Sequence, residues 1–166
     1  MGAGRLSRLA GVGAALLRSR RFTRAPIWLY RLRLGALLGP RLLLLEHRGR
    51  SSGLARHVVL EVIGHPSPRR YVVASGFGER AQWFRNVRAD PRVRVTIGSH
   101  APAPATARVL DQREADRALG DYIAAHPGTW DRFKSVLEQT LGAEVTEVDT
   151  PLPMVELALD DPATRS

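Results

Sequence analysis

The stretch that most restricts the fold of this chain is a glycine- and arginine-rich octet, Gly49-Arg50-Ser51-Ser52-Gly53-Leu54-Ala55-Arg56. Apolar residues 42–45 precede it, and apolar residues 58–60 and 62–63 follow it. Both runs are short and bounded by turn residues, as β-strands are. The octet, called the 49–56 tip below, is therefore predicted to join two neighbouring strands.

The residue types of the 49–56 tip suit an anion. Two glycines allow backbone angles that other residues avoid, so successive N–H groups can converge on one point. Arg50 and Arg56 flank that point, and the hydroxyls of Ser51 and Ser52 lie inside it. Converging donors and fixed cations favour a phosphate or a carboxylate. The alternative is a solvated hairpin tip, because short glycine motifs often match by chance.

The rest of the chain has the pattern of consecutive strands with a few helices. Further strands are predicted over residues 56–63, 71–75, 92–97, 105–110 and 154–159, and helices over residues 79–88, 111–123 and 129–141. The strands follow one another without crossover helices, which argues against a doubly wound sheet. We therefore expect an α+β fold, a barrel of about six mostly antiparallel strands with peripheral helices.

Local signals set several boundaries in this prediction. Pro66 and Pro68 predict a turn at residues 64–68, because proline cannot donate to a strand ladder. A capping-box pattern from Asp111 to Glu114 begins one helix, and Thr129 is expected to cap the next. Gly142 is expected to end that helix.

The net charge of +9 is concentrated at the start of the chain. Residues 1–50 hold eleven arginines and one glutamate, whereas residues 51–166 are almost neutral. The division indicates a basic amphipathic helical arm (residues 1–40), a barrel domain (41–160) and a polar tail (161–166). Nucleic-acid-binding domains usually carry basic residues across their folded part, so no nucleic acid partner is expected.

The basic arm has the spacing of membrane-surface helices. Aliphatic residues share one helical face over residues 5–21, and Trp28 and Tyr30 follow beside arginines. Such segments lie in anionic membrane surfaces, so residues 5–38 are a candidate peripheral membrane contact. The alternative is packing of the arm on the barrel. No export signal is complete, and we expect a cytoplasmic protein, with contact at the inner face of the membrane as a hypothesis.

Several kinds of site are not indicated. The chain has no cysteine, which excludes disulfides and thiolate metal ligands. Its five histidines are scattered without the spacing of metal ligands, so no metal is predicted. No Ser–His–acid set is evident either.

A second candidate anion site is Ala74-Ser75-Gly76-Phe77-Gly78, where a predicted strand runs through small residues into a predicted helix. A helix N-terminus offers N–H groups and the positive end of its dipole to an anion or a polarised ring edge. Small residues also let a flat ring approach the backbone. The alternative is a simple strand-to-helix turn.

Four ordered blocks resemble the deazaflavin (coenzyme F420)-dependent nitroreductase and quinone reductase family. They are Gly49-Arg50-Ser51-Ser52-Gly53-x-x-Arg56, Val73-Ala74-Ser75-x-x-Gly78, Trp83-Phe84-Arg85-Asn86-Val87 and Ala89-Asp90-Pro91-x-Val93-x-Val95. Their order and spacing agree over residues 41–110, which is more specific than any one glycine motif. The resemblance implies a split β-barrel, similar to FMN-binding barrels. It also implies an oxidoreductase that uses reduced F420 to deliver hydride to quinones, nitro compounds or related small molecules.

The resemblance also implies roles for particular residues. The phosphate of F420 would be held by Arg50, Ser52, Gly53 and Arg56, with Ser51 where many members carry lysine. The deazaflavin ring would be lined by Ala74, Ser75 and Gly78, and the adjoining helix would contribute Trp83 and Asn86. Hydride leaves the C5 atom of the ring, so no protein nucleophile is required.

Candidates for the acceptor side are fewer. Residues 126–130 lie where some quinone reductases have tyrosines near their substrate, and no tyrosine here matches one to one. The candidates are Ser75, Tyr122, His126 and Trp130.

Two other functions are compatible with the same fold. Similar split barrels bind FMN or haem, so the cofactor could be a flavin. The chain could also be a non-catalytic protein that holds deazaflavin at the membrane surface. A homodimer is a further option, since split barrels often pair through sheet faces.

Overall fold

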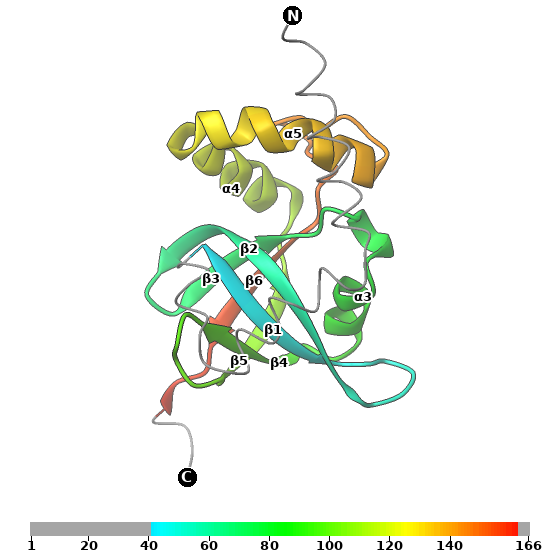
Figure 1. Cartoon of the computed structure of the whole chain (residues 1–166), viewed down its shortest axis with the longest axis vertical. Coiled ribbons are helices and arrows are strands. Elements are labelled where there is room, and N and C mark those ends of the chain that lie inside the picture. Colours follow the sequence, from blue (N-terminus) through cyan, green and yellow to red (C-terminus); the bar gives the residue numbers. More distant parts are fainter. Residues whose placement is uncertain (1–40, 163–166) are drawn as a thin grey trace, which may run out of the picture.

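The structure is a computed structural model that describes residues 41–162, in which six strands close into a barrel (Figure 1). The strand order is β1-β2-β3-β6-β5-β4, and every neighbouring pair is antiparallel. The strands are β1 (Leu42–Arg48), β2 (Ala55–Ser67), β3 (Arg70–Ala74), β4 (Arg92–Ile97), β5 (Ala103–Val109) and β6 (Met154–Leu159). The predicted α+β barrel is confirmed.

Strand β1 lies between β2 and β4 and places alternate side chains inside the barrel. Leu43 and Leu45 are fully buried there, and His47 continues the same inward row. The 49–56 tip then turns the chain into β2, as predicted. Its turn is closed by the Gly53 N–H, which donates to the Gly49 carbonyl at 2.7 Å, and Gly53 has a φ of +66°.

The predicted turn at residues 64–68 is wrong, because β2 continues to Ser67. The pairing with β3 shifts register between Val62 and Gly64 and again between Gly64 and Ser67. The second shift puts one extra β2 residue into the interval that contains Pro66. A bulge leaves a residue unpaired, so the missing proline N–H costs no ladder hydrogen bond.

Helices cover two parts of the barrel. A 3-10 turn, η2 (Gly78–Arg80), leads into α3 (Gln82–Ala89), so this helix begins later than the predicted residue 79. The chain also forms α4 (Gln112–Ala125) and α5 (Pro127–Leu141). Figure 1 shows α4 and α5 together above the barrel and α3 at its side. No helix within residues 41–162 is long and apolar enough to cross a membrane.

The helix ends follow their sequence signals with one exception. The capping box of Asp111 and Glu114 is present at the start of α4, and Gly142 ends α5 with a φ of +79°. Thr129 is not the cap of α5, contrary to the prediction. The helix begins at Pro127, whose fixed φ suits a first helical position, and His126 occupies the cap position.

Two hydrophobic clusters stabilise this arrangement. One fills the barrel and includes Val73 of β3 and Phe84 of α3. The other lies between the barrel and helices α4 and α5, where it includes Val72 of β3 and Leu119 of α4. Strand β3 is therefore buried on both faces at Val72 and Val73, which explains why both of these consecutive residues are apolar. The predicted arm over residues 1–40 lies outside the described residues.

The first cluster predicts a strong dependence of stability on Leu45. Replacing Leu45 with alanine should lower the free energy of unfolding by about 2–5 kcal/mol, because it opens a cavity in the barrel. Leu54→Ala is the matched control, since Leu54 is 62% exposed, and it should change stability by about 0.5 kcal/mol or less. Chemical denaturation measures both, and equal effects would contradict this description of the core.

Candidate functional site

The 49–56 tip and helix α3 form two walls of a cavity of about 760 Å³. The structure brings together here six residues that sequence comparison assigned to cofactor binding: Arg50, Ser51, Ser52, Arg56, Trp83 and Asn86. These residues come from positions up to 36 apart in the chain. The cavity also contains residues that were not predicted, among them His47, Phe77 and Arg80.

The 49–56 tip is attached to α3 through the side-chain amide of Asn86. Its Oδ1 atom accepts hydrogen bonds from the Arg50 backbone N–H at 3.1 Å and from Arg50 Nη1 at 3.0 Å. Gln82 Oε1 accepts a second bond from Arg50 Nη1 at 2.9 Å. Both acceptors are neutral amides, so they orient the guanidinium without cancelling its charge. The cavity wall therefore carries an oriented and uncompensated cation.

His47 supports Asn86 from inside the barrel. The two side chains are buried, and Asn86 Nδ2 lies 3.1 Å from His47 Nδ1. Because the amide nitrogen donates, Nδ1 must carry a lone pair. Burial, with smaller contributions from His57 and Arg56, lowers the pKa of the His47 imidazole to about 4. The imidazole is therefore neutral at neutral pH and fixes which way the Asn86 amide faces.

Sequence reasoning missed His47, because it treated the histidines as scattered. The signal that could have found it is its place in the alternating pattern of β1. Leu43, Leu45 and His47 share the inward face, so a polar ring was to be expected beside the 49–56 tip.

The loop between β3 and α3 is held in place by the end of α5. Thr140 Oγ1 donates to the Gly76 carbonyl at 2.7 Å, and Arg80 Nη2 donates to the Thr140 carbonyl at 3.1 Å. Ser75 is fully buried, and its hydroxyl donates to the Gly78 carbonyl at 2.7 Å. Ser75 and Gly78 therefore shape the loop that carries Phe77 to the cavity, and neither lines the cavity itself.

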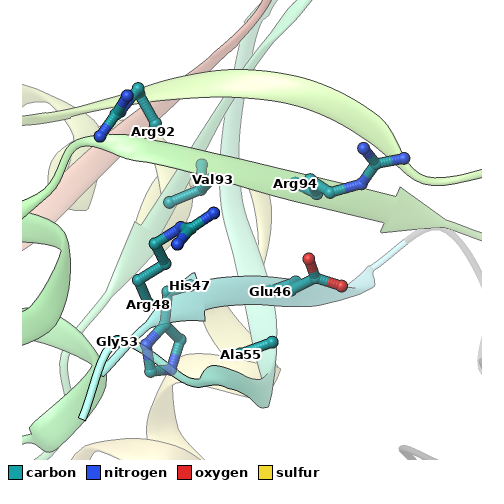
Figure 2. A pocket seen from close by; sticks show the side chains of 8 residues that line it. All are labelled: Glu46, His47, Arg48, Gly53, Ala55, Arg92, Val93 and Arg94. Atoms are coloured by element: carbon teal, nitrogen blue, oxygen red, sulfur yellow. The ribbon is translucent and has the colours of Figure 1, made fainter.

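The remaining predicted residues lie elsewhere. Gly53 lines a neighbouring hollow of about 310 Å³, shown in Figure 2. Ala74 lines a small cavity of about 100 Å³ together with Tyr122 and Trp130. His126 is exposed at the junction of α4 and α5, and its ring centre lies 5.2 Å from that of Tyr122. Two acceptor-side candidates thus share a cavity that is separate from the one at the 49–56 tip.

The small cavity has a polar cluster at its edge. The Tyr122 hydroxyl donates to Glu61 Oε1 at 3.0 Å, and Arg41 Nη2 donates to the same oxygen at 2.9 Å. Burial and the Glu61 carboxylate raise the pKa of Tyr122, so the phenol is protonated at neutral pH. No group of three or more potential metal ligands occurs within residues 41–162.

Comparison with solved structures supports the barrel fold. An F420-H2 dependent reductase (FDR-A) is 23% identical, with 70% of this chain and 93% of that chain covered and a TM-score of 0.49. A protein of unknown function from Agrobacterium tumefaciens str. C58 is 16% identical over 82% of this chain and 56% of that chain, with a TM-score of 0.54. A putative pyridoxamine 5'-phosphate oxidase from Listeria innocua is 14% identical, with 77% of this chain and 90% of that chain covered and a TM-score of 0.50. The last two show the fold alone, and the first, with its TM-score below 0.5, adds no argument.

Comparison with protein families is more specific. No curated protein matches the chain. One family model, described as F420H(2)-dependent quinone reductase, matches residues 23–148. This match includes the 49–56 tip, the loop after β3 and all of α3, and it extends over more than half of the chain. The protein therefore belongs to the F420H(2)-dependent quinone reductase family, whose cofactor is coenzyme F420.

Proposed function

We propose that this protein transfers hydride from reduced coenzyme F420 to a quinone, a nitro compound or a related small acceptor. Membership of the family supports an F420H2-dependent oxidoreductase. The observation that carries the proposal is the oriented Arg50 guanidinium on the wall of the 760 Å³ cavity. Together with Arg56, Ser51 and Ser52 it forms a donor set that suits a phosphate.

The cavity also suits the ring of the coenzyme. Its volume lies within the range of about 300–1,000 Å³ that is usual for small-molecule sites. Trp83, Phe77 and Ala81 supply apolar surface opposite the polar tip. The bound coenzyme would supply the hydride, and the residues of the chain would bind it, orient it and exclude water.

Residues outside the cavity contribute less directly in this proposal. Ser75 and Gly78 hold the loop that carries Phe77, so they act as positioning residues. Tyr122, Trp130 and Ala74 line the separate apolar cavity, which is a candidate for an apolar portion of the acceptor. His126 stays an acceptor-side prediction, and the homodimer stays a prediction from the sequence.

Residues 5–38 are proposed to contact an anionic membrane surface, where an apolar acceptor could be reached. The support is their arginine content and helical spacing, since the structure describes residues 41–162 only. In the same proposal the protein is cytoplasmic and peripheral at the inner face of the membrane.

Removal of two arginines tests the cofactor site. Replacing both Arg50 and Arg56 with alanine should weaken binding of oxidised F420 by about tenfold or more, because charge-assisted hydrogen bonds are lost. Fluorescence titration measures this, with FMN titrated in parallel. Arg132→Ala is the matched control, because Arg132 is exposed on α5. Preference for FMN, or unchanged binding of F420 by the double variant, would contradict the proposal.

The neutral state of His47 predicts a pH dependence of stability. Between about pH 6.5 and pH 4 the unfolded chain binds a proton at this position and the folded protein does not. The free energy of unfolding should therefore fall as the pH is lowered through this window. His47→Asn keeps an acceptor for Asn86 without titrating, so it should lose less stability between pH 7 and about pH 4.5. Denaturation curves at both pH values would refute this if the two proteins lost stability equally.

Deletion of residues 1–40 tests the membrane contact. The full chain should sediment with anionic lipid vesicles and bind less to neutral ones, because the arm carries most of the net charge. The truncated protein should lose this preference while it still binds F420. If it sediments with anionic vesicles as the full chain does, the arm is not the membrane contact.

A further inference from the structure

The buried imidazole of His47 is linked to the 49–56 tip through one other side chain. His47 is 5% exposed on β1, and its Nδ1 atom lies 3.1 Å from Asn86 Nδ2 on α3. The Asn86 Oδ1 atom accepts hydrogen bonds from the Arg50 backbone N–H and from Arg50 Nη1. Figure 2 shows His47 on β1 near Gly53 of the tip, and both line the same hollow. The series His47, Asn86 and Arg50 therefore joins the barrel interior to the cation of the candidate phosphate site.

Donors and acceptors fix the direction of these hydrogen bonds. Both groups of Arg50 are donors, so they require the oxygen of the Asn86 amide and not its nitrogen. The nitrogen then needs an acceptor inside the barrel, and the unprotonated Nδ1 atom of His47 supplies one. Without the imidazole, a buried Asn86 N–H group would lose its partner, which is unfavourable.

The surroundings of His47 keep its ring an acceptor. Burial is the main cause of its low pKa, and the nearby His57 and Arg56 lower that pKa further. Glu46 is the acid next to His47 on β1, and its Oε2 atom lies 3.1 Å from Nε2 of His57. The environment of His47 therefore favours the neutral ring that Asn86 needs.

Loss of this acceptor would be felt at Arg50. Asn86 lines the 760 Å³ cavity, so its side chain can turn to bring the unpaired nitrogen toward water there. That rotation takes Oδ1 away from both donors of Arg50. Arg50 Nη1 would keep its bond to Gln82 at 2.9 Å, whereas the Arg50 backbone N–H would lose the Asn86 oxygen. The tip would then have to be ordered by its ligand, and such ordering lowers affinity.

We propose that His47 is a positioning residue for coenzyme binding, because its imidazole holds Asn86 in the orientation that fixes Arg50. Its effect on the coenzyme passes through Asn86 and Arg50, and the ring itself takes no part in hydride transfer. The inference rests on the proposed function, since it requires the phosphate of F420 at Arg50. It adds a residue of the barrel interior to the determinants of coenzyme affinity.

Two substitutions of His47 test this role in fluorescence titrations of oxidised F420 at neutral pH. His47→Leu removes the acceptor and should weaken binding by about three- to tenfold. His47→Asn should bind within about twofold of the native protein, because its amide oxygen, like Nδ1, is bonded to Cγ and can accept the same hydrogen bond. If His47→Leu does not fold, His47→Gln takes its place, since its amide lies one carbon further along the side chain.

A double-mutant comparison tests whether the effect passes through Arg50. In an Arg50→Ala background, His47→Leu should change the affinity for F420 by about twofold or less, because no guanidinium is left to position. The same loss as in the native background would show that His47 acts on the coenzyme directly, and it would overturn the proposal. Where Arg50→Ala binds too weakly to titrate, rescue by His47→Asn decides the question.

Leu45→Val is the matched control, because Leu45 is buried on the same inward face of β1 and does not line the cavity. It should lower stability and leave the affinity for F420 within about twofold. Equal weakening by Leu45→Val and His47→Leu would overturn the proposal, since it would reflect general loosening of the barrel. Native-like binding by His47→Leu, or equal weakening by His47→Leu and His47→Asn, would also overturn it. Each of these results leaves the proposed function standing, whereas a native protein that binds no F420 would refute both.

Discussion

The candidate site depends on one buried amide. Asn86 joins three elements, because its nitrogen faces His47 of β1 and its oxygen holds both the backbone and the side chain of Arg50. A neutral His47 is what makes this orientation the stable one, since a protonated imidazole would set two donors against each other. Loss of the Asn86 oxygen would leave the guanidinium of Arg50 held by Gln82 alone and its backbone N–H without this acceptor.

Local patterns in the sequence were enough to predict the barrel and most of its strands. Residues 92–97 and 154–159 read as strands and form β4 and β6 at those bounds. The error at Pro66 has a physical cause, because a bulge depends on the partner strand and leaves no local signal. The tip and α3 were found through a family resemblance, whereas His47 and Arg80 act through contacts between distant segments that a single sequence does not display.

The division of the predicted site into separate spaces follows from the pleat of β3. Val73 points into the barrel, while Val72 and Ala74 face the layer under α4 and α5. Consecutive residues of β3 therefore face alternately the barrel interior and the layer under α4 and α5, although they are adjacent in sequence. The next residue, Ser75, is fully buried, and its hydroxyl donates to the Gly78 carbonyl and so shapes the loop.

The pairing of β1 with β4 closes the sheet, and closure has a consequence for assembly. Within residues 41–162 each strand of the barrel has a neighbour on both sides, so the sheet offers no free edge. A second molecule cannot extend it by adding a strand unless the barrel first opens. For the described residues, contacts between intact barrels would therefore use side chains on the outer faces or on the helices, and the paired edges protect the fold from edge-to-edge aggregation.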